Sequence, residues 1–236
     1  MTVVTSGDAD ELAATVAHQL RRSISQLQAD PDRVVQLCLT GGRIANRMYR
    51  QLADGQGDDN TVDWKRVEFW WGDERFVATE SPDRNAGQTL ALLAATIPLD
   101  PARVHPMPAE GGQADLNQAA MQYAAELGDI RFDICLLGMG PDGHVASIFP
   151  DHPSFEQDTS FTVVGVTDSP KPPPERISLT IPVINQSAEV WLIVAGAEKA
   201  DAAARAIDGD ENLPAGAVHG RLRTVWFLDE DAAADR

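Results

Sequence analysis

The sequence predicts an α/β fold in which helices cover both faces of a mainly parallel sheet. Short apolar runs alternate with amphipathic stretches along the chain, and most apolar runs are nearly continuous. Such runs are typical of parallel strands, because the helices that connect these strands bury both faces of the sheet. We therefore expect parallel strands joined by helical crossovers.

The elements follow from this pattern in order. The expected strands are short and bounded by turn-forming residues: Val3–Thr5, Val34–Leu39, Arg66–Trp71, Phe132–Leu137, Phe161–Val166, Ile177–Thr180, Val190–Val194 and Thr224–Leu228. The expected helices have apolar residues at helical spacing: Ala9–Leu27, Ile44–Leu52, Asn85–Ala95, Ala114–Leu127 and Glu198–Ile207. We find no repeat and no low-complexity linker, so residues 1–236 are expected to form one domain with room for a small lobe or insertion. The residues after Leu228 are expected to be frayed.

Charge and composition limit the possible partners and location. The net charge of −17 argues against nucleic acid and anionic membranes, which attract basic faces. No apolar run is long enough to cross a bilayer, and the first residues lack the pattern of an export signal. Cys38 and Cys135 lie in apolar runs, as expected for core residues in a reduced compartment. We expect a cytoplasmic protein whose oligomeric state, monomer or dimer, remains open.

Ligands of open parallel sheets bind beyond the carboxyl ends of the strands, so the segments that follow the strands carry most information. Thr40, Gly41, Gly42 and Arg43 connect a strand to a helix. Glycines there let backbone N–H groups approach an anion at the start of a helix. The equal alternative is a tight turn that binds nothing.

Charged residues follow the next strand. Asp73, Glu74 and Arg75 are expected to form one turn on the binding rim, although such triplets are more often solvated. Asn85 is expected to cap the following helix and to lie near the same rim.

The segment from Leu136 to Pro150, LLGMGPDGHVASIFP, contains the glycine pattern G-x-G-x-x-G. A dinucleotide site would need a sustained helix after it and an acid at the end of the next strand. Pro150 and Pro153 limit any helix to about two turns, and no acid closes the next strand. The segment instead presents Gly140, Asp142 and His144 in a loop.

A histidine at the end of a strand can act as a general base, and Asp142 could orient its ring. The acids and histidines near His144 have no recognised metal-ligand spacing, and the chain has no G-x-S-x-G motif. Two cations, Arg176 and Lys199, border later strands and are candidate counter-charges for a phosphate. Only three lysines are present, which makes Lys199 more informative than an ordinary surface cation.

Together, TGGR, WWGDERFV, GMGPDGHVASIFP, PKPPPERISLT and AGAEKA resemble the 6-phosphogluconolactonase family in order and spacing. The related glucosamine-6-phosphate deaminases have an acid five positions after the histidine, where this chain has Phe149. They also have a tyrosine at the position of Arg75. Both differences favour a lactonase over a deaminase or isomerase.

The resemblance implies a three-layer αβα sandwich, Rossmann-like, that hydrolyses 6-phospho-D-glucono-1,5-lactone without a cofactor or a required metal. It implies that His144 is the base, that Asp142 orients it, and that Arg75, Asp73 and Asn85 surround the sugar. It further implies a phosphate site formed by Gly41, Gly42, Arg43, Arg176 and Lys199. A non-catalytic sugar-phosphate sensor is the alternative from another class, and the chain has no spare length for the partner domain that such sensors carry.

Overall fold

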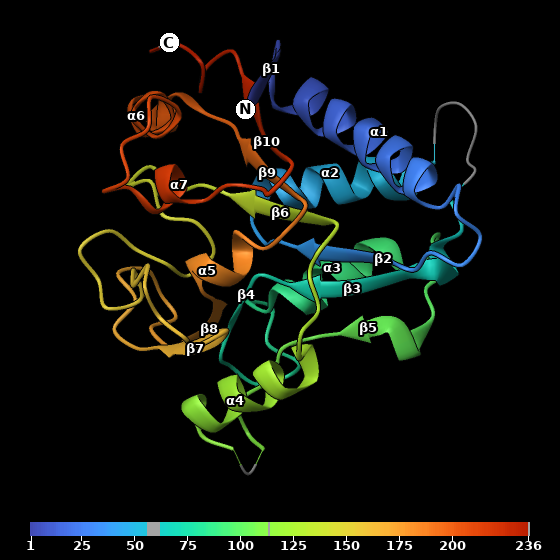
Figure 1. Cartoon of the computed structure of the whole chain (residues 1–236), viewed down its shortest axis with the longest axis vertical. Helices are drawn as coiled ribbons and strands as arrows, with labels where there is room; N and C mark the ends of the chain where they lie inside the picture. Colours follow the sequence, from blue (N-terminus) through green and yellow to red (C-terminus); the bar gives the residue numbers. More distant parts are fainter. Residues whose placement is uncertain (56–61, 113, 236) are drawn as a thin grey trace.

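A computed structural model describes residues 1–55, 62–112 and 114–235 of the chain. Its centre is a seven-stranded sheet whose neighbouring strands all run parallel (Figure 1). In spatial order the strands are β1 (Thr2–Ser6), β10 (Arg223–Asp229), β9 (Glu189–Val194), β6 (Ile134–Gly138), β2 (Val35–Leu39), β3 (Val67–Trp71) and β5 (Val104–His105). The predicted parallel sheet is confirmed. The sequence did not predict β5, which is only two residues long.

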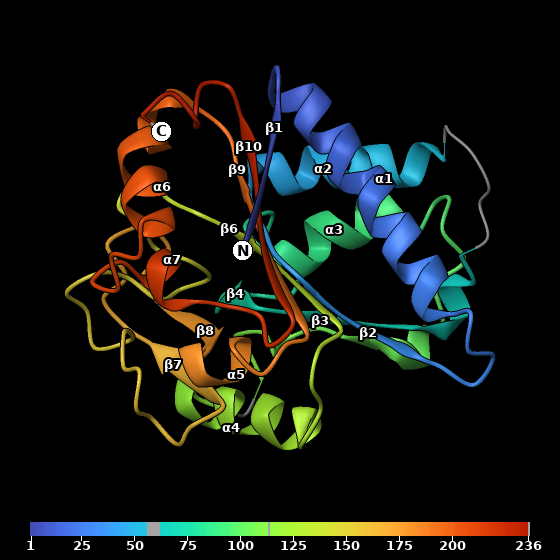
Figure 2. The ribbon, with the colours of Figure 1, turned by 45° about the horizontal axis from the view of Figure 1, so that its top comes forward.

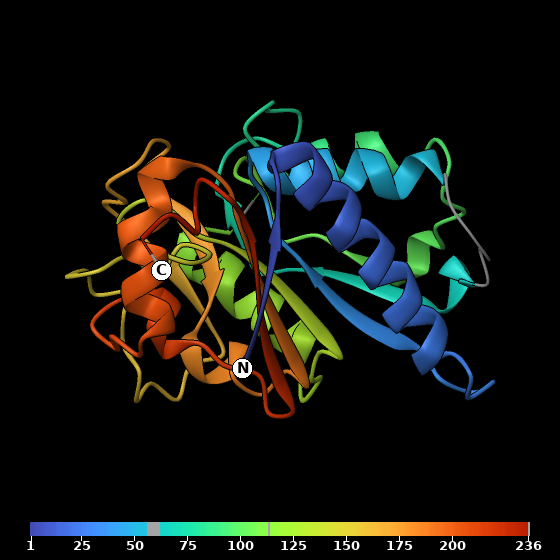
Figure 3. The ribbon, with the colours of Figure 1, turned by 90° about the horizontal axis from the view of Figure 1, so that it is seen from above.

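Helices cover both faces of this sheet, which confirms the predicted three-layer αβα architecture. Figures 2 and 3 show α1 (Ala9–Leu27), α2 (Arg43–Asp54) and α3 (Asn85–Leu93) on one side. The other side carries α4 (Leu116–Leu127), α6 (Ala200–Ile207) and α7 (Pro214–Ala217). None of the described helices combines the length and apolar character needed to span a membrane.

Alternation of side chains along the strands divides the core into two clusters. Leu37 and Leu39 pack with residues of α1 and α2, whereas Cys38 packs with residues of α4 and α6. The same alternation occurs in β10, where Trp226 lies on the second side. Burial of both faces therefore explains why the strand sequences are almost continuously apolar.

The smaller elements connect these layers. A short helix, α5 (Ile181–Ile184), precedes β9 in the chain. The described residues also form the 3₁₀ turns η1 (Trp64–Arg66), η2 (Pro101–Arg103) and η3 (Ala197–Lys199). The turn η3 occupies the start of the expected helix Glu198–Ile207, so the α-helix itself begins only at Ala200.

A second sheet of three antiparallel strands lies beside α4 and was not predicted. Its order is β4 (Asp73–Arg75), β8 (Arg176–Leu179) and β7 (Val163–Val166). The expectation that Asp73, Glu74 and Arg75 form a turn is therefore wrong. These residues pair with β8, which gives their backbone groups hydrogen-bond partners and places Arg75 directly opposite Arg176.

The strand order of the large sheet reverses between β2 and β6. From β2 the chain continues to β3 and β5 on one side, whereas from β6 it continues to β9 and β10 on the other. Connections that diverge in this way leave a crevice at the carboxyl ends of the strands. At this point the Thr40 hydroxyl accepts the backbone N–H of Gly138 at 3.3 Å.

The segment after Leu228 is ordered through its first turn, so the expectation of a frayed tail is wrong there. The buried carboxylate of Asp229 accepts the N–H of Gly196 at both oxygens, at 3.0 and 3.1 Å. It also accepts the N–H of Ala232 at 2.8 Å, and Ala232 is buried. These bonds fix the tail against the loop that follows β9.

Candidate active site

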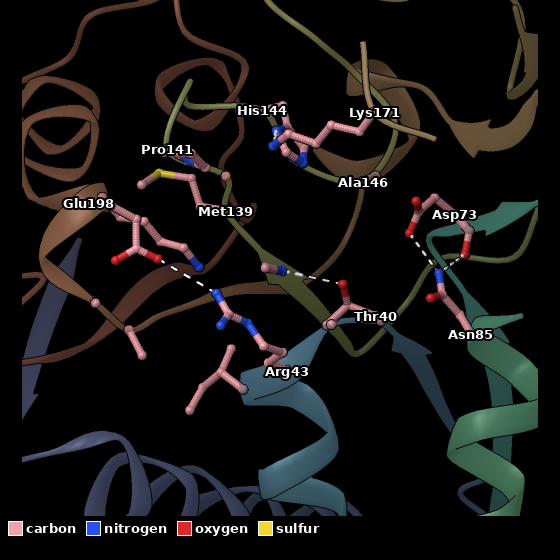
Figure 4. A pocket seen from close by; sticks show the side chains of 18 of the residues that line it. Thr40, Arg43, Asp73, Asn85, Met139, Pro141, His144, Ala146, Lys171 and Glu198 are labelled. Atoms are coloured by element: carbon pink, nitrogen blue, oxygen red, sulfur yellow. Dashed lines mark hydrogen bonds and ion pairs between the residues drawn. The ribbon is translucent and has the colours of Figure 1, made fainter. Parts of the chain in front are cut away.

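A pocket of about 720 Å³ opens at the carboxyl ends of β2 and β6 (Figure 4). Every predicted site residue except Asp142 lines it: Thr40, Gly41, Gly42, Arg43, Asp73, Arg75, Asn85, Gly140, His144, Arg176 and Lys199. Segments far apart in the sequence thus meet in one cavity. Residues that were not predicted also line it, among them Lys171, Glu198, Asp229 and Asp231.

The turn after β2 presents the start of α2 to the pocket. Gly42 is the N-cap, has a φ of +107° that favours glycine, and supplies no side-chain acceptor to the helix. Gly41 has no room for a side chain, since a Cβ would lie 2.0 Å from Oδ1 of Asn85. The first N–H groups of this 12-residue helix and its dipole favour an anion at this end of the pocket.

Two cations border the start of α2. Arg43 is exposed, and its guanidinium lies 3.8 Å from the carboxylate of Glu198. Lys199 ends η3, and burial lowers the pKa of its ammonium, an effect that the charge of Glu198 opposes. The ion pairs found within the described residues do not include Lys199. A partly desolvated ammonium without an ion pair is a natural counter-charge for a bound anion.

His144 and Asp142 belong to the histidine loop, residues 139–150, which follows β6. Gly140 donates to the carbonyl of His144, and Gly143 donates to that of Gly140, both at 3.0 Å. These bonds fold the loop back on itself, and it forms turns and isolated bridges, in agreement with the expected loop. The His144 ring also packs against Phe149, with 4.8 Å between ring centroids.

The contact between His144 and Asp142 fixes the position of a proton. Nδ1 of His144 lies 2.5 Å from Oδ1 of Asp142. Partial burial acts to raise the pKa of Asp142, but the hydrogen bond from His144 and the charge of Lys171 act to lower it, and it lies well below its usual range. An ionised carboxylate at this distance requires the proton on Nδ1, which leaves Nε2 free to accept one.

The two acids of β4 have different surroundings: Asp73 lies in the pocket, and Glu74 lies at the start of α3. Asp73 lines the pocket, and its carboxylate accepts the Ser147 hydroxyl at 2.7 Å. The buried carboxylate of Glu74 accepts the N–H groups of Asn85 and Ala86, at 2.7 and 2.9 Å. The expectation that Asn85 caps its helix is wrong, because α3 begins at Asn85 and Glu74 supplies the acceptor.

The two arginines of the small sheet have different environments. The Arg75 guanidinium donates to the carbonyl of Asp83 at 2.5 Å. Its buried Nε has no partner among the described residues. Arg176 is buried and donates to the carbonyls of Lys171, Pro172 and Pro173, at 2.9, 3.2 and 3.2 Å. Much of the Arg176 guanidinium is therefore engaged by backbone, which leaves fewer donors for a phosphate than the sequence suggested.

Lys171 is the candidate that the sequence reasoning missed. Its Nζ lies 3.1 Å from Nδ1 of His144 and 3.5 Å from Oδ1 of Asp142. Its rarity could have marked it as a candidate site residue, since it is one of three lysines in the chain. Nothing in the sequence distinguishes the pocket acids Glu198, Asp229 and Asp231, because the chain has 36 acidic residues. The described residues contain no group of three or more His, Cys, Asp or Glu side chains that could hold a metal ion.

The fold and the pocket define an α/β protein that can hold an anion at a helix start and offers a carboxylate–imidazole pair in the same cavity. The sequence model of one family, described as glucosamine-6-phosphate isomerases/6-phosphogluconolactonase, matches residues 7–226. The chain belongs to this family.

Individual relatives agree with this assignment. The chain is 43% identical to the 6-phosphogluconolactonase of Streptomyces coelicolor, over 98% of this chain and 93% of that protein. It is 41% identical to that of Mycobacterium tuberculosis, over 96% and 95%. The crystal structure of 6-phosphogluconolactonase from Thermotoga maritima superposes with a TM-score of 0.84 at 28% identity, over 97% and 99%. A monomeric glucosamine-6-phosphate deaminase, 23% identical with a TM-score of 0.80 and full coverage of both chains, shares the fold.

Proposed function

We propose that this protein hydrolyses 6-phospho-D-glucono-1,5-lactone to 6-phospho-D-gluconate, the second step of the oxidative pentose phosphate pathway. The observation that carries the proposal is the Asp142–His144 pair in a pocket that also contains the start of α2. The substrate has a phosphate at one end and an electrophilic carbonyl at the other, and the pocket offers a group for each. Relatives called 6-phosphogluconolactonase at 41–43% identity over nearly the whole chain support this reaction.

The proposed substrate pose follows from the charges. The phosphate lies at the start of α2 between Arg43 and Lys199, with Arg176 contributing the donors that its backbone contacts leave free. The hydroxyl groups of the sugar lie along Asp73, Arg75 and Asn85, and the backbone of the turns after β2 and β6 completes the site at Thr40 and Gly140. This pose brings the lactone carbonyl to His144.

His144 is the proposed general base. Its Nε2 takes a proton from water while the water oxygen attacks the carbonyl carbon, and a tetrahedral intermediate forms. The bond from this carbon to the ring oxygen then breaks, and the imidazolium returns the proton to that oxygen. Asp142 holds the ring by Nδ1 and stabilises its charged form. The reaction needs no cofactor, since water and the lactone supply all its atoms and electrons.

Phe149 distinguishes this proposal from deamination or isomerisation. The related deaminases have an acid at this position, whereas the Phe149 side chain is buried against the His144 ring. No carboxylate is therefore available there to open an amino-sugar ring. Incubation with glucosamine-6-phosphate should release no ammonia.

The direct test generates the lactone with glucose-6-phosphate dehydrogenase and follows its disappearance above the spontaneous rate. His144→Ala should lower kcat by about 10²–10⁴-fold with a modest change in KM, because the base acts in the chemical step. His18→Ala, which changes an exposed histidine of α1, is the matched control. Failure of the unaltered protein to accelerate hydrolysis would sink the proposal. A rise in KM alone for His144→Ala would make His144 a binding residue.

We also propose that residues 1–236 act as one domain, in the cytoplasm, on a small sugar phosphate. The net charge of −17 supports a partner other than nucleic acid or an anionic membrane. Both hydrophobic clusters lie against the same large sheet, which supports a single folding unit.

A further inference from the structure

Lys171 places an ammonium beside the Asp142–His144 pair. It belongs to the lysine strap, residues 169–174, and its side chain is 40% exposed and lines the pocket. Figure 4 shows this side chain extending toward the His144 ring. Nζ lies 3.1 Å from Nδ1 of His144 and 3.5 Å from Oδ1 of Asp142. This cation takes no part in the proton transfers proposed for His144.

The positions of the protons leave the ammonium with few partners. Because Nδ1 carries the proton that is donated to Asp142, the contact between Nζ and Nδ1 is not a hydrogen bond. Among the described residues, the remaining acceptor near Nζ is Asp142, at the long distance of 3.5 Å. Lys171 thus has N–H donors available to a ligand in the pocket.

Hydrogen bonds hold the backbone of the lysine strap firmly, whereas the ammonium of Lys171 has only a long contact with Asp142. The Ser169 hydroxyl bonds to the carbonyl of Lys171 at 3.0 Å, and the buried Arg176 guanidinium donates to the same carbonyl at 2.9 Å. Arg176 also donates to the next two carbonyls of the strap. This arrangement fixes the base of the Lys171 side chain beside the histidine loop, while its four-carbon stem can move the ammonium.

The charges change in a definite way during hydrolysis. Before attack, the Asp142 carboxylate faces both the neutral His144 ring and the Lys171 ammonium. When water attacks, His144 gains a positive charge and the carbonyl oxygen gains a negative one. The imidazolium then attracts the Asp142 carboxylate more strongly than the neutral ring did. Its charge also repels the Lys171 ammonium, whose Nζ lies 3.1 Å from Nδ1 of His144. The new oxyanion then offers Lys171 a second counter-charge, in addition to the Asp142 carboxylate that it shares with the imidazolium.

We propose that Lys171 is a further catalytic residue, which donates a charge-assisted hydrogen bond to the oxyanion of the tetrahedral intermediate. No atom or electron is transferred to Lys171 in this step; the ammonium stabilises charge and releases it when the carbonyl re-forms. Arg176 is a positioning residue for Lys171 in this scheme. The inference rests on the proposed lactonase function.

A kinetic comparison separates this role from phosphate binding. Lys171→Met should lower kcat by about 10²-fold, the usual loss when one oxyanion donor is removed, with little change in KM. Lys199→Met should mainly raise KM. Lys65→Met, in an exposed lysine of η1, is the matched control and should behave like the unaltered protein. A raised KM with unchanged kcat for Lys171→Met would overturn the inference, and so would unchanged kinetics.

Chemical restoration of the charge tests the same protein before and after treatment, so a folding defect cannot imitate the result. Lys171→Cys introduces an accessible thiol, whereas Cys38 and Cys135 are fully buried. Alkylation with 2-bromoethylamine rebuilds an ammonium side chain close to lysine in length and should restore most of kcat. Iodoacetamide adds a neutral group and should restore none. Equal recovery with both reagents would show that side-chain volume matters and would overturn the inference. An inactive unaltered protein would instead reject the lactonase proposal itself.

Discussion

The hydroxyl of Ser147 donates a 2.7 Å hydrogen bond to the carboxylate of Asp73, and both side chains are buried. This bond joins the histidine loop to β4 of the small sheet. Asp73 also accepts the side-chain amide of Asn85 at 3.4 Å. The relative positions of the Asp73 carboxylate and the histidine loop thus depend on contacts between segments that are distant in the sequence.

Removal of the Ser147 hydroxyl should destabilise the protein. In Ser147→Ala the buried Asp73 carboxylate loses a donor, which should lower the free energy of unfolding by about 1–3 kcal/mol. Urea denaturation measures the difference, with Ser160→Ala at an exposed position as control. Equal stability of the two variants would show that the carboxylate finds a replacement donor.

A methyl group at Gly140 should impair catalysis by moving the histidine. The added Cβ would lie 2.1 Å from Cε1 of His144 and 2.5 Å from Oδ1 of Asp142, so the ring must shift. Gly140→Ala should therefore lower kcat by about 10²-fold, the loss typical of a misplaced catalytic group. Gly112→Ala is the matched control, since nothing lies within 4 Å of its added Cβ. Normal kcat for Gly140→Ala would mean that the ring position is not critical.

Binding of 6-phosphogluconate should weaken as the pH rises. Burial places the pKa of Lys199 below its ordinary value of 10.5. The ammonium is charged below this lowered pKa and loses its proton as the pH rises through it, so its attraction for phosphate is lost in that direction. Near this pKa, binding should also take up a proton, which calorimetry in two buffers of different ionisation enthalpy detects.

The comparison for this pH dependence is Lys199→Arg. Arginine keeps its charge throughout the accessible range, so the fall in affinity should move to higher pH. An identical pH dependence for the variant and the unaltered protein would assign the titration to another group.

Asp229 should affect substrate binding through the turn that carries Lys199. In Asp229→Asn, an amide NH₂ group can face the N–H of Gly196, which now has a carboxylate oxygen at 3.1 Å. Loss of a charged hydrogen bond of about 1.5 kcal/mol should raise KM about tenfold, with kcat nearly unchanged. Steady-state kinetics of Asp229→Asn and of Asp235→Asn, a change at an exposed position, make the comparison. A lower kcat at constant KM would contradict this explanation.

The sequence predicted the features that have local causes. The apolar run Val35–Leu39 and the glycines after it predict a strand, a tight turn and a helix start, and all three occur. The proline positions correctly argued against a dinucleotide-binding helix after Gly143. Phe149, whose identity favours a lactonase over a deaminase, is buried with its ring against His144, and this preference itself stays a prediction.

The missed features arise from contacts between distant segments. Asp73–Arg75 looks like a charged turn, and its pairing with β8 depends on residues about a hundred positions away. Likewise, Glu74 caps α3 only because β4 lies at the start of this helix. The position of Lys171 beside His144 depends on carbonyl contacts with Arg176, for which the sequence contains no periodic signal.

The pairing of β1 with β10 has a consequence for how the chain folds during synthesis. β1 is an edge strand of the large sheet, and its neighbour β10 is made after all the other described strands. On the ribosome, residues 2–6 must therefore wait for residues 223–229 before they can join the sheet. Asp229, at the end of this late strand, also fixes the loop before Lys199. The end of the pocket at which we propose that phosphate binds consequently forms late, so a partly synthesised chain would lack this proposed site.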